Sequence, residues 1–298
     1  MTPVIELKKV SKQFKETVVL KNISLSMYEG ECIVLLGKNG AGKSTIINLI
    51  LDLFYPTSGE VKLSYQKKDI GFLSQKSRFP DDVTIQEMLD FVASFSNRPL
   101  TNEEINHVLQ FDSKKYKQLI DTCSGGEQRL FDMCLAILNR PKLLIVDEPT
   151  TGMDTSTRNH FWQIIQELKN SGTTILFTTH YVEEVDYCAD RVILLDNGII
   201  QADETPYHLR TLNKKKRITI EKSSYLQLEG KIKSLLKEKT IQFENKQDVV
   251  VLEFQNEQTS VVLKELLQIG LPFDNVEITN NSLLEMIFNN QFDEKEEE

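Results

Sequence analysis

Residues 37–45 read GKNGAGKST, and this stretch has the spacing of a phosphate-binding P-loop. Glycines let a loop wrap closely around phosphate oxygens, and the amides at the start of the following helix point at them. The nine residues that would bind in this way are Gly37, Lys38, Asn39, Gly40, Ala41, Gly42, Lys43, Ser44 and Thr45. The pattern predicts a nucleoside triphosphate site, with Lys43 on the outer phosphates and the Ser44 hydroxyl on Mg²⁺.

The neighbouring sequence has the context that this mechanism requires. An apolar run at residues 32–36 precedes the loop and predicts a strand, and residues 45–54 predict a helix. A glycine-rich turn ahead of a core helix is the alternative interpretation. The strand–loop–helix order favours the nucleotide site.

Two adjacent carboxylates, Asp147 and Glu148, end an apolar strand in the sequence LLIVDEP, residues 143–149. Consecutive strand residues face opposite ways, so the two acids cannot do the same job. We expect Asp147 to reach the Mg²⁺ shell and Glu148 to face the attacking water as general base. The alternative is that both acids only cap the next helix.

A second anion-binding helix start is predicted at Ser124, Gly125 and Gly126, in the sequence CSGGE of residues 123–127. An ordinary serine cap is the alternative, and for these three residues alone it would be preferred. Their position directly upstream of the strand that carries Asp147 favours the phosphate role.

Composition narrows the class of protein. The chain has 298 residues, 40% of them hydrophobic and 27% charged, which is enough for one large or two modest domains. No apolar stretch approaches the roughly 20 residues that span a bilayer, and the N-terminus is no secretory signal, so we expect a soluble, cytosolic chain. A net charge of −9 argues against nucleic acid as a partner. Four cysteines without a C-x-x-C pair predict buried thiols.

Strands and helices alternate along the first two thirds of the chain, which predicts an α/β fold with a mostly parallel sheet. We expect a first domain at residues 1–212, with a helical subdomain at about 76–140. An accessory α+β domain at 213–290 and an acidic tail at 291–298 would follow. The elements expected in the accessory domain are strands 217–221, 248–254 and 275–279 and helices 225–238, 259–269 and 282–288.

The motifs GKNGAGKST, CSGGE and LLIVDEP, in this order, resemble those of the nucleotide-binding subunit of an ATP-binding cassette (ABC) transporter. The resemblance covers about residues 4–210. It implies a P-loop NTPase cassette with a small antiparallel β region and a helical subdomain, and it implies ATP and Mg²⁺ as cofactors.

The resemblance also implies roles for single residues. Gln75 matches the family's Q-loop, whose side chain reaches Mg²⁺ and the attacking water. Asp154 resembles the acid of the D-loop, His180 the switch histidine that contacts the γ-phosphate, and Phe14 the aromatic ring that stacks on adenine. The sequence departs from the family at Cys123, where leucine is usual.

A second departure is Glu127, where the family has glutamine. It leaves the serine and glycines in place but adds a negative charge near a phosphate-facing loop. The region after His180, THYVEEVDYCADRVILLDNG, resembles drug- and antibiotic-resistance exporters. The resemblance therefore implies an ATPase that powers an integral membrane permease, working as a dimer with a second ATPase subunit, a homodimer, at the cytoplasmic face of the cell membrane.

Two other functions fit parts of the pattern. A soluble ABC-type ATPase acting on ribosomes or DNA usually has two cassettes or a long coiled coil, whereas this sequence has one cassette and no heptad run. A nucleotide sensor without turnover is disfavoured because Lys43, Gln75, Glu148 and His180 are all present.

Overall fold

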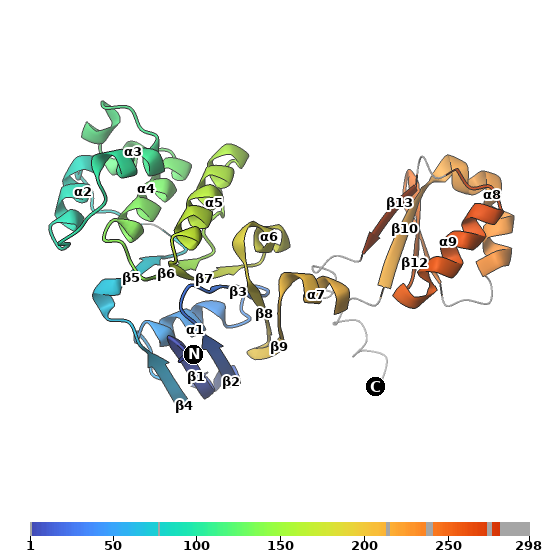
Figure 1. Ribbon diagram of the computed structural model, residues 1–298, viewed down its shortest axis with the longest axis horizontal. Coiled ribbons are helices and arrows are strands. Elements are labelled where there is room, and N and C mark those ends of the chain that lie inside the picture. Colours follow the sequence, from blue (N-terminus) through green and yellow to red (C-terminus); the bar gives the residue numbers. More distant parts are fainter. Residues whose placement is uncertain (1, 77, 213–214, 237–240, 273–275, 281–298) are drawn as a thin grey trace. The chain divides into compact units, whose positions relative to one another are not determined.

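The computed structural model describes residues 2–76, 78–212, 215–236, 241–272 and 276–280. The chain divides into two compact units, Met1–Pro206 and Tyr207–Glu298. Figure 1 shows the elements of each unit. All of helix α7 except its first residue, Pro206, falls in the second unit, so this division lies a few residues before the boundary that we expected at residue 212.

The centre of the first unit is a mostly parallel sheet, with the strand order β5-β6-β7-β3-β8-β9 among the described residues. Neighbouring strands from β5 to β8 pair in parallel, and only β9 is antiparallel. The strands are β3 (Cys32–Leu36), β5 (Ile70–Leu73), β6 (Leu143–Asp147), β7 (Thr174–Thr179), β8 (Arg191–Asp196) and β9 (Ile199–Glu204). Every residue of β3, β6 and β7 is buried, which explains why each strand contains a run of consecutive apolar residues. The buried polar residues are Asp147 at the end of β6 and the threonines at both ends of β7.

Helices follow three of these strands; those after β6 and β7 lead to the next parallel strand, whereas α1 leads to a strand of the second sheet described below. They are α1 (Lys43–Ile50) after β3, α5 (Thr155–Asn170) after β6, and η4 (Val182–Glu184) with α6 (Val185–Cys188) after β7. Because β6, β7 and β3 are neighbours in the sheet, the loops at their carboxyl ends meet at one edge. That edge is where open α/β sheets bind ligands.

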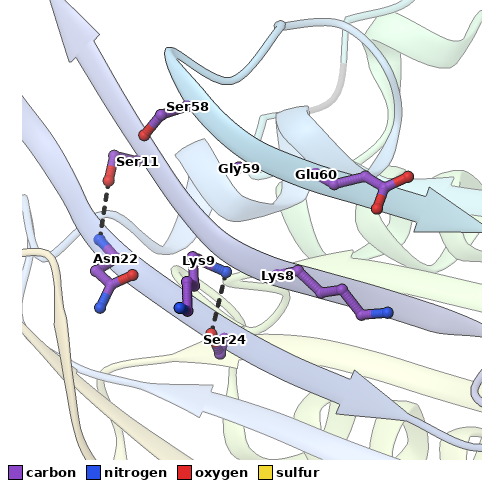
Figure 2. Close-up of a pocket in the computed structure, with 8 residues that line it drawn as sticks. All are labelled: Lys8, Lys9, Ser11, Asn22, Ser24, Ser58, Gly59 and Glu60. Carbon is purple, nitrogen blue, oxygen red and sulfur yellow. Dashed lines mark hydrogen bonds between the residues drawn. The ribbon is translucent and has the colours of Figure 1, made fainter.

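A second, antiparallel sheet contains β1 (Ile5–Phe14), β2 (Thr17–Met27) and β4 (Ser58–Leu63) in the order β2-β1-β4. Its apolar side shares one core with α1 and with β3. The pairing of β1 with each neighbour shifts register around Lys9, which has a φ of +49°. A hollow of about 700 Å³ on this sheet is lined by lysines, serines and an asparagine (Figure 2), and it contains none of the predicted site residues.

The predicted helical subdomain is present in the first unit, gathered beside β5 in Figure 1. Its elements are α2 (Ile85–Ala93), α3 (Asn102–Leu109), η2 (Lys115–Lys117), η3 (Ile120–Thr122) and α4 (Gly125–Ile137), and the short η1 (Lys67–Asp69) precedes β5. Capping boxes at Thr84, Thr101 and Ser124 begin the three α-helices. Phe91 and Phe95 have the i, i+4 spacing of residues on one face of a helix, and they are 60% and 72% exposed.

The second unit is a four-stranded antiparallel sheet in the order β11-β12-β10-β13, within the described part of the chain. Its elements are α7 (Pro206–Leu212), β10 (Lys215–Glu221), α8 (Lys222–Leu236), β11 (Gln242–Asn245), β12 (Val249–Gln255), η5 (Asn256–Gln258), α9 (Thr259–Gln268) and β13 (Val276–Asn280). Alternate residues of β10 and β12, including Ile218 and Leu252, share a core with α8 and α9, so both helices cover one face. The predicted helix 282–288 and the acidic tail lie outside the described residues.

Strand β11 was not expected from the sequence. All four of its residues, QFEN, are exposed, so it carries no apolar alternation. The four cysteines are free thiols and all are buried, as their spacing predicted.

Candidate nucleotide-binding and catalytic site

The P-loop wraps around the side chain of Lys43, which is only 4% exposed. Its Nζ donates hydrogen bonds to the backbone oxygens of Gly37, at 2.8 Å, and of Lys38, at 3.1 Å. Glycine is required at two points of this loop: Gly42 has a φ of +108°, and a Cβ on Gly37 would lie 2.2 Å from the backbone oxygen of Leu195. The loop therefore fixes an ammonium group at the start of α1.

The carboxylate of Glu148 is the point at which the predicted catalytic residues meet. Its Oε1 lies 3.1 Å from Lys43 Nζ. Its Oε2 accepts a hydrogen bond from Gln75 Nε2 at 3.0 Å and lies 3.4 Å from His180 Nδ1. Glu148 is 8% exposed and has a φ of +42°, which is unusual for a side chain other than glycine, asparagine or aspartate.

Each of these residues comes from a loop at the carboxyl edge of the parallel sheet. Glu148 follows β6, Gln75 follows β5 and His180 follows β7, while Lys43 begins the helix after β3. The topology of the sheet thus brings together residues that are up to 137 positions apart in the sequence. A buried carboxylate held between two polar side chains and an ammonium group can accept a proton and polarise a water molecule.

The carboxylate of Asp147 bonds Thr178, a residue that the carboxylate of Glu148 does not contact. Thr178 Oγ1 donates to Asp147 Oδ1, and the Glu148 amide donates to the same Thr178 oxygen at 3.0 Å. The register of β6 and β7 pairs Asp147 with Thr178 directly, so the threonine holds both acids at the strand end. Ser44 at the start of α1 is exposed. The hydroxyl of Ser44, the amide oxygen of Gln75 and the carboxylate of Asp147 are the oxygen ligands that Mg²⁺ prefers.

Two other predicted site residues and one predicted site segment lie apart from Glu148. Among the described residues, none of the contacts of Glu148 involves Phe14, Asp154 or the signature segment, by which we mean residues 123–127. The Phe14 ring is 38% exposed and packs edge-on against Phe54, with ring centroids 5.3 Å apart.

Asp154 and Ser124 both begin helices. Asp154 Oδ1 accepts from the amides of Ser156 and Thr157, and the Thr157 hydroxyl donates to Asp154 Oδ2 at 2.6 Å. These bonds lower the pKa of Asp154, the Thr157 hydroxyl most of all. Ser124 Oγ caps α4. Gly126 is the second residue of α4, and a Cβ atom added to it would lie 3.3 Å from the Thr157 side chain. The two helix starts are therefore neighbours.

Cys123, at the start of the signature segment, is 9% exposed, and burial raises the pKa of its thiol. A buried thiol with a raised pKa is a poor nucleophile, because little of it is thiolate at neutral pH. This environment fits the packing role that the apolar residue has in the family.

Sequence reasoning missed two buried charged residues beside the site. Arg129, 6% exposed, donates from Nε to the Pro149 oxygen at 2.8 Å and from Nη2 to the Asp147 oxygen at 3.3 Å, and Nη1 bonds the oxygen of Ser74. Burial lowers the pKa of this guanidinium. The sequence feature that could have indicated a buried Arg129 is a charged residue among the apolar residues of the predicted helix, directly before Leu130.

The second missed residue is Glu184, which is 3% exposed and accepts a hydrogen bond from the Thr150 hydroxyl. Burial raises the pKa of this carboxyl group above its ordinary value. Glu184 therefore joins the segment after Glu148 to the segment after His180. Nothing in its own sequence position distinguishes it from the neighbouring Glu183, which is exposed.

Within the described ranges, no helix is both long enough and apolar enough to cross a lipid bilayer.

Comparisons with known proteins agree with this geometry. A family model described as ABC transporter matches residues 20–151. The Nod factor export ATP-binding protein I of Cupriavidus pinatubonensis is 32% identical over 223 residues, 70% of this chain and 68% of that protein. The linearmycin resistance ATP-binding protein LnrL of Bacillus subtilis is 33% identical over 65% of this chain and 67% of that protein.

Solved structures show the same fold. A dimeric bacterial ABC transporter cassette is 25% identical, with a TM-score of 0.59, and covers 68% of this chain and 98% of its own. A cassette in a post-hydrolysis state with ADP and phosphate is also 25% identical, with a TM-score of 0.58. The chain belongs to the ABC transporter family, as an ATP-binding subunit. It is an ATPase that powers transport, which confirms the predicted fold and enzyme class.

Proposed function

We propose that this chain hydrolyses ATP at the Glu148 site and that a permease in the membrane uses the energy to export a drug, antibiotic, peptide or lipid-like compound. The observation that carries the proposal is the contact of Lys43, Gln75 and His180 with one buried carboxylate. Relatives named for Nod factor export, linearmycin resistance and, in Homo sapiens, a phospholipid-transporting ATPase (ABCA3, 34% identical over 66% of this chain and 12% of that protein) support the substrate range.

Lys43 binds the outer phosphates of ATP in this mechanism. Its ammonium group is held by two backbone oxygens and is free to exchange Glu148 for phosphate oxygens. The ion pair between Lys43 and Glu148 is almost fully buried, and two buried charges are stable only while each has a partner. When phosphate oxygens replace Glu148 as the partner of Lys43, the Glu148 carboxylate becomes available to bind a water molecule.

Glu148 then acts as general base and accepts a proton from the attacking water, while Gln75 and His180 orient its Oε2 atom. Ser44, Gln75 and Asp147 would hold Mg²⁺, which neutralises charge on the phosphates. His180 would contact the γ-phosphate, and Phe14 offers an exposed ring face to adenine.

The working unit is a dimer of two such subunits, a homodimer, in which the P-loop of each copy faces the signature segment of the other. Asp154 lies at the start of a neighbouring helix and would join that interface. The dimeric cassette structures support this arrangement. ATP bound between the copies would close them, and hydrolysis would separate them.

The permease would bind the helical subdomain, which lies between Gln75 and Ser124 in the sequence. Exposed Phe91 and Phe95 form an edge-on ring pair, with centroids 5.1 Å apart, that suits an apolar partner surface. This partner would place the chain at the cytoplasmic face of the cell membrane. The net charge of −9 disfavours nucleic acid as a partner.

Phosphate release from the purified chain tests this function, measured alone, with detergent-solubilised permease recovered by co-purification from membranes, and with ribosomes or DNA. We expect stimulation by the permease only, and its loss in Glu148→Gln. Stimulation by ribosomes or DNA without a co-purifying membrane protein would instead support the soluble ATPase.

A further inference from the structure

The carboxylate of Glu127 stands where a family member has an uncharged amide, and in this chain it completes the cap of α4. Glu127 Oε2 accepts from the Ser124 amide at 2.9 Å, and Ser124 Oγ accepts from the Glu127 amide at 3.3 Å. A glutamate or a glutamine side chain at position 127 can make this reciprocal pair of bonds. The cap therefore explains the shape of the signature segment but not its added charge.

The added charge is unfavourable for the role that we propose for the segment. Ser124, Gly125 and Gly126 would meet the phosphates of ATP on the partner copy, and a carboxylate at the next residue repels them. Glu127 is 32% exposed, so solvent screens this repulsion only in part. A positive group beside Glu127 would offset it.

Lys115 supplies that group. Its Nζ donates a hydrogen bond to Glu127 Oε1, the carboxylate oxygen that the cap does not use. This bond is the main cause of a lowered pKa at Glu127, so the carboxylate is charged at neutral pH. The two side chains are 23% and 32% exposed.

The backbone amide and the ammonium group of Lys115 both contact neighbouring residues. The Lys115 amide donates to Asp112 Oδ1 at 3.0 Å, which fixes the turn that begins η2. Its Nζ also lies 5.3 Å from the centre of the Phe111 ring, within the range of a cation–π contact. A lysine held by these two contacts loses less entropy when it pairs with Glu127 than a freely moving one.

We propose that Lys115 is a positioning residue of the signature segment. Through Glu127 it holds the Ser124 cap in place, and it offsets the negative charge that this chain presents to the phosphates of the partner's ATP. The inference rests on the proposed function, because the phosphates belong to the dimer described above. Glu127 is thus one half of a charge pair whose other half, Lys115, lies in η2 of the same helical subdomain.

The test is a double-mutant cycle on the hydrolysis-deficient Glu148→Gln chain, with the ATP concentration for half-maximal dimer formation as the readout. Methionine replaces lysine at nearly equal length without charge. We expect Lys115→Met to raise this concentration about tenfold when Glu127 is present, and by less than about twofold in the chain that also carries Glu127→Gln. Arg140→Met, which breaks the ion pair of Arg140 with Glu104 in the same subdomain, is the matched control and should leave the concentration unchanged.

Amide hydrogen exchange gives a second readout in the chain without ATP. Lys115→Met should speed exchange at the amides of Ser124 and Glu127, which the capping box protects. An equal effect of Lys115→Met with and without Glu127→Gln would overturn the inference, as would unchanged exchange at both amides. Failure of the Glu148→Gln chain itself to dimerise with ATP would contradict the proposed function and overturn this inference with it.

Discussion

Replacing Arg129 by methionine should destabilise the first unit more than any exposed arginine substitution can. The guanidinium of Arg129 is buried in α4 and bonds three backbone oxygens, those of Ser74, Asp147 and Pro149. Ser74 precedes Gln75, and the other two residues flank Glu148. Methionine fills similar space but donates nothing, so all three oxygens lose this partner.

The magnitude follows from these three bonds. A hydrogen bond to a charged group contributes roughly 1.5–3 kcal/mol, and such bonds in one network are not additive. Removing one member of a buried charged network costs about 3–5 kcal/mol, so we expect a loss of about 4 kcal/mol in the free energy of unfolding. At about 2–4 °C for each kcal/mol, the melting temperature should fall by about 8–16 °C.

The single tryptophan provides the assay. Trp162 is 1% exposed and lies in α5, so urea unfolding followed by its fluorescence reports on the first unit alone. Arg129→Lys should lower the free energy of unfolding by about half as much as Arg129→Met, because one ammonium group cannot reach three separate oxygens. Arg140→Met, from a pair that is 38% and 41% exposed, should lose no more than about 1 kcal/mol. A loss of less than about 1 kcal/mol for Arg129→Met would refute this reasoning.

Further predictions concern the nucleotide, a thiol and the second unit. Glu148→Gln should still bind ATP but lose turnover by on the order of 10² or more, measured as phosphate release; full turnover would exclude it as the base. Phe14→Ala should weaken ATP binding by about 1 kcal/mol in a titration, and an unchanged dissociation constant would place the adenine elsewhere. Cys123 should react slowly with a thiol reagent in the ATP-free protein, followed by mass spectrometry, because burial raises its pKa; rapid labelling would show an accessible thiolate. Truncation after residue 212 should leave ATP binding near normal but weaken dimer formation or transport coupling, and equal dimerisation and transport by both chains would contradict that role.

The parallel sheet and its site loops were predictable because their signals are local. Strands β3, β6 and β7 are buried on both faces, so each contains a run of consecutive apolar residues and ends beside a motif. The P-loop and the acidic pair at Asp147 each occupy consecutive residues. The alternation of strands and helices was then enough to predict a mostly parallel sheet. Glu148 lies at the carboxyl edge of that sheet, directly after β6.

The rest depends on contacts that leave no local pattern. Arg129 donates to three backbone oxygens. Every residue has a backbone oxygen, so these three partners have no sequence signature. Lys115 lies 12 positions before Glu127, and only the fold shows that they pair. Strand β11 pairs with β12 through its backbone while its own side chains are exposed, so no periodicity indicated it.

The central claim is that each ATP site contains the P-loop of one copy and the signature segment of the other. Mixing a Lys43→Ala chain with a Ser124→Arg chain tests this directly. Each variant alone has two defective sites in every dimer, whereas a mixed dimer concentrates both defects in one site and leaves the other intact. Random pairing predicts recovery of about a quarter of the wild-type phosphate release. No activity in the mixture, with mixed dimers shown to form, would contradict the claim.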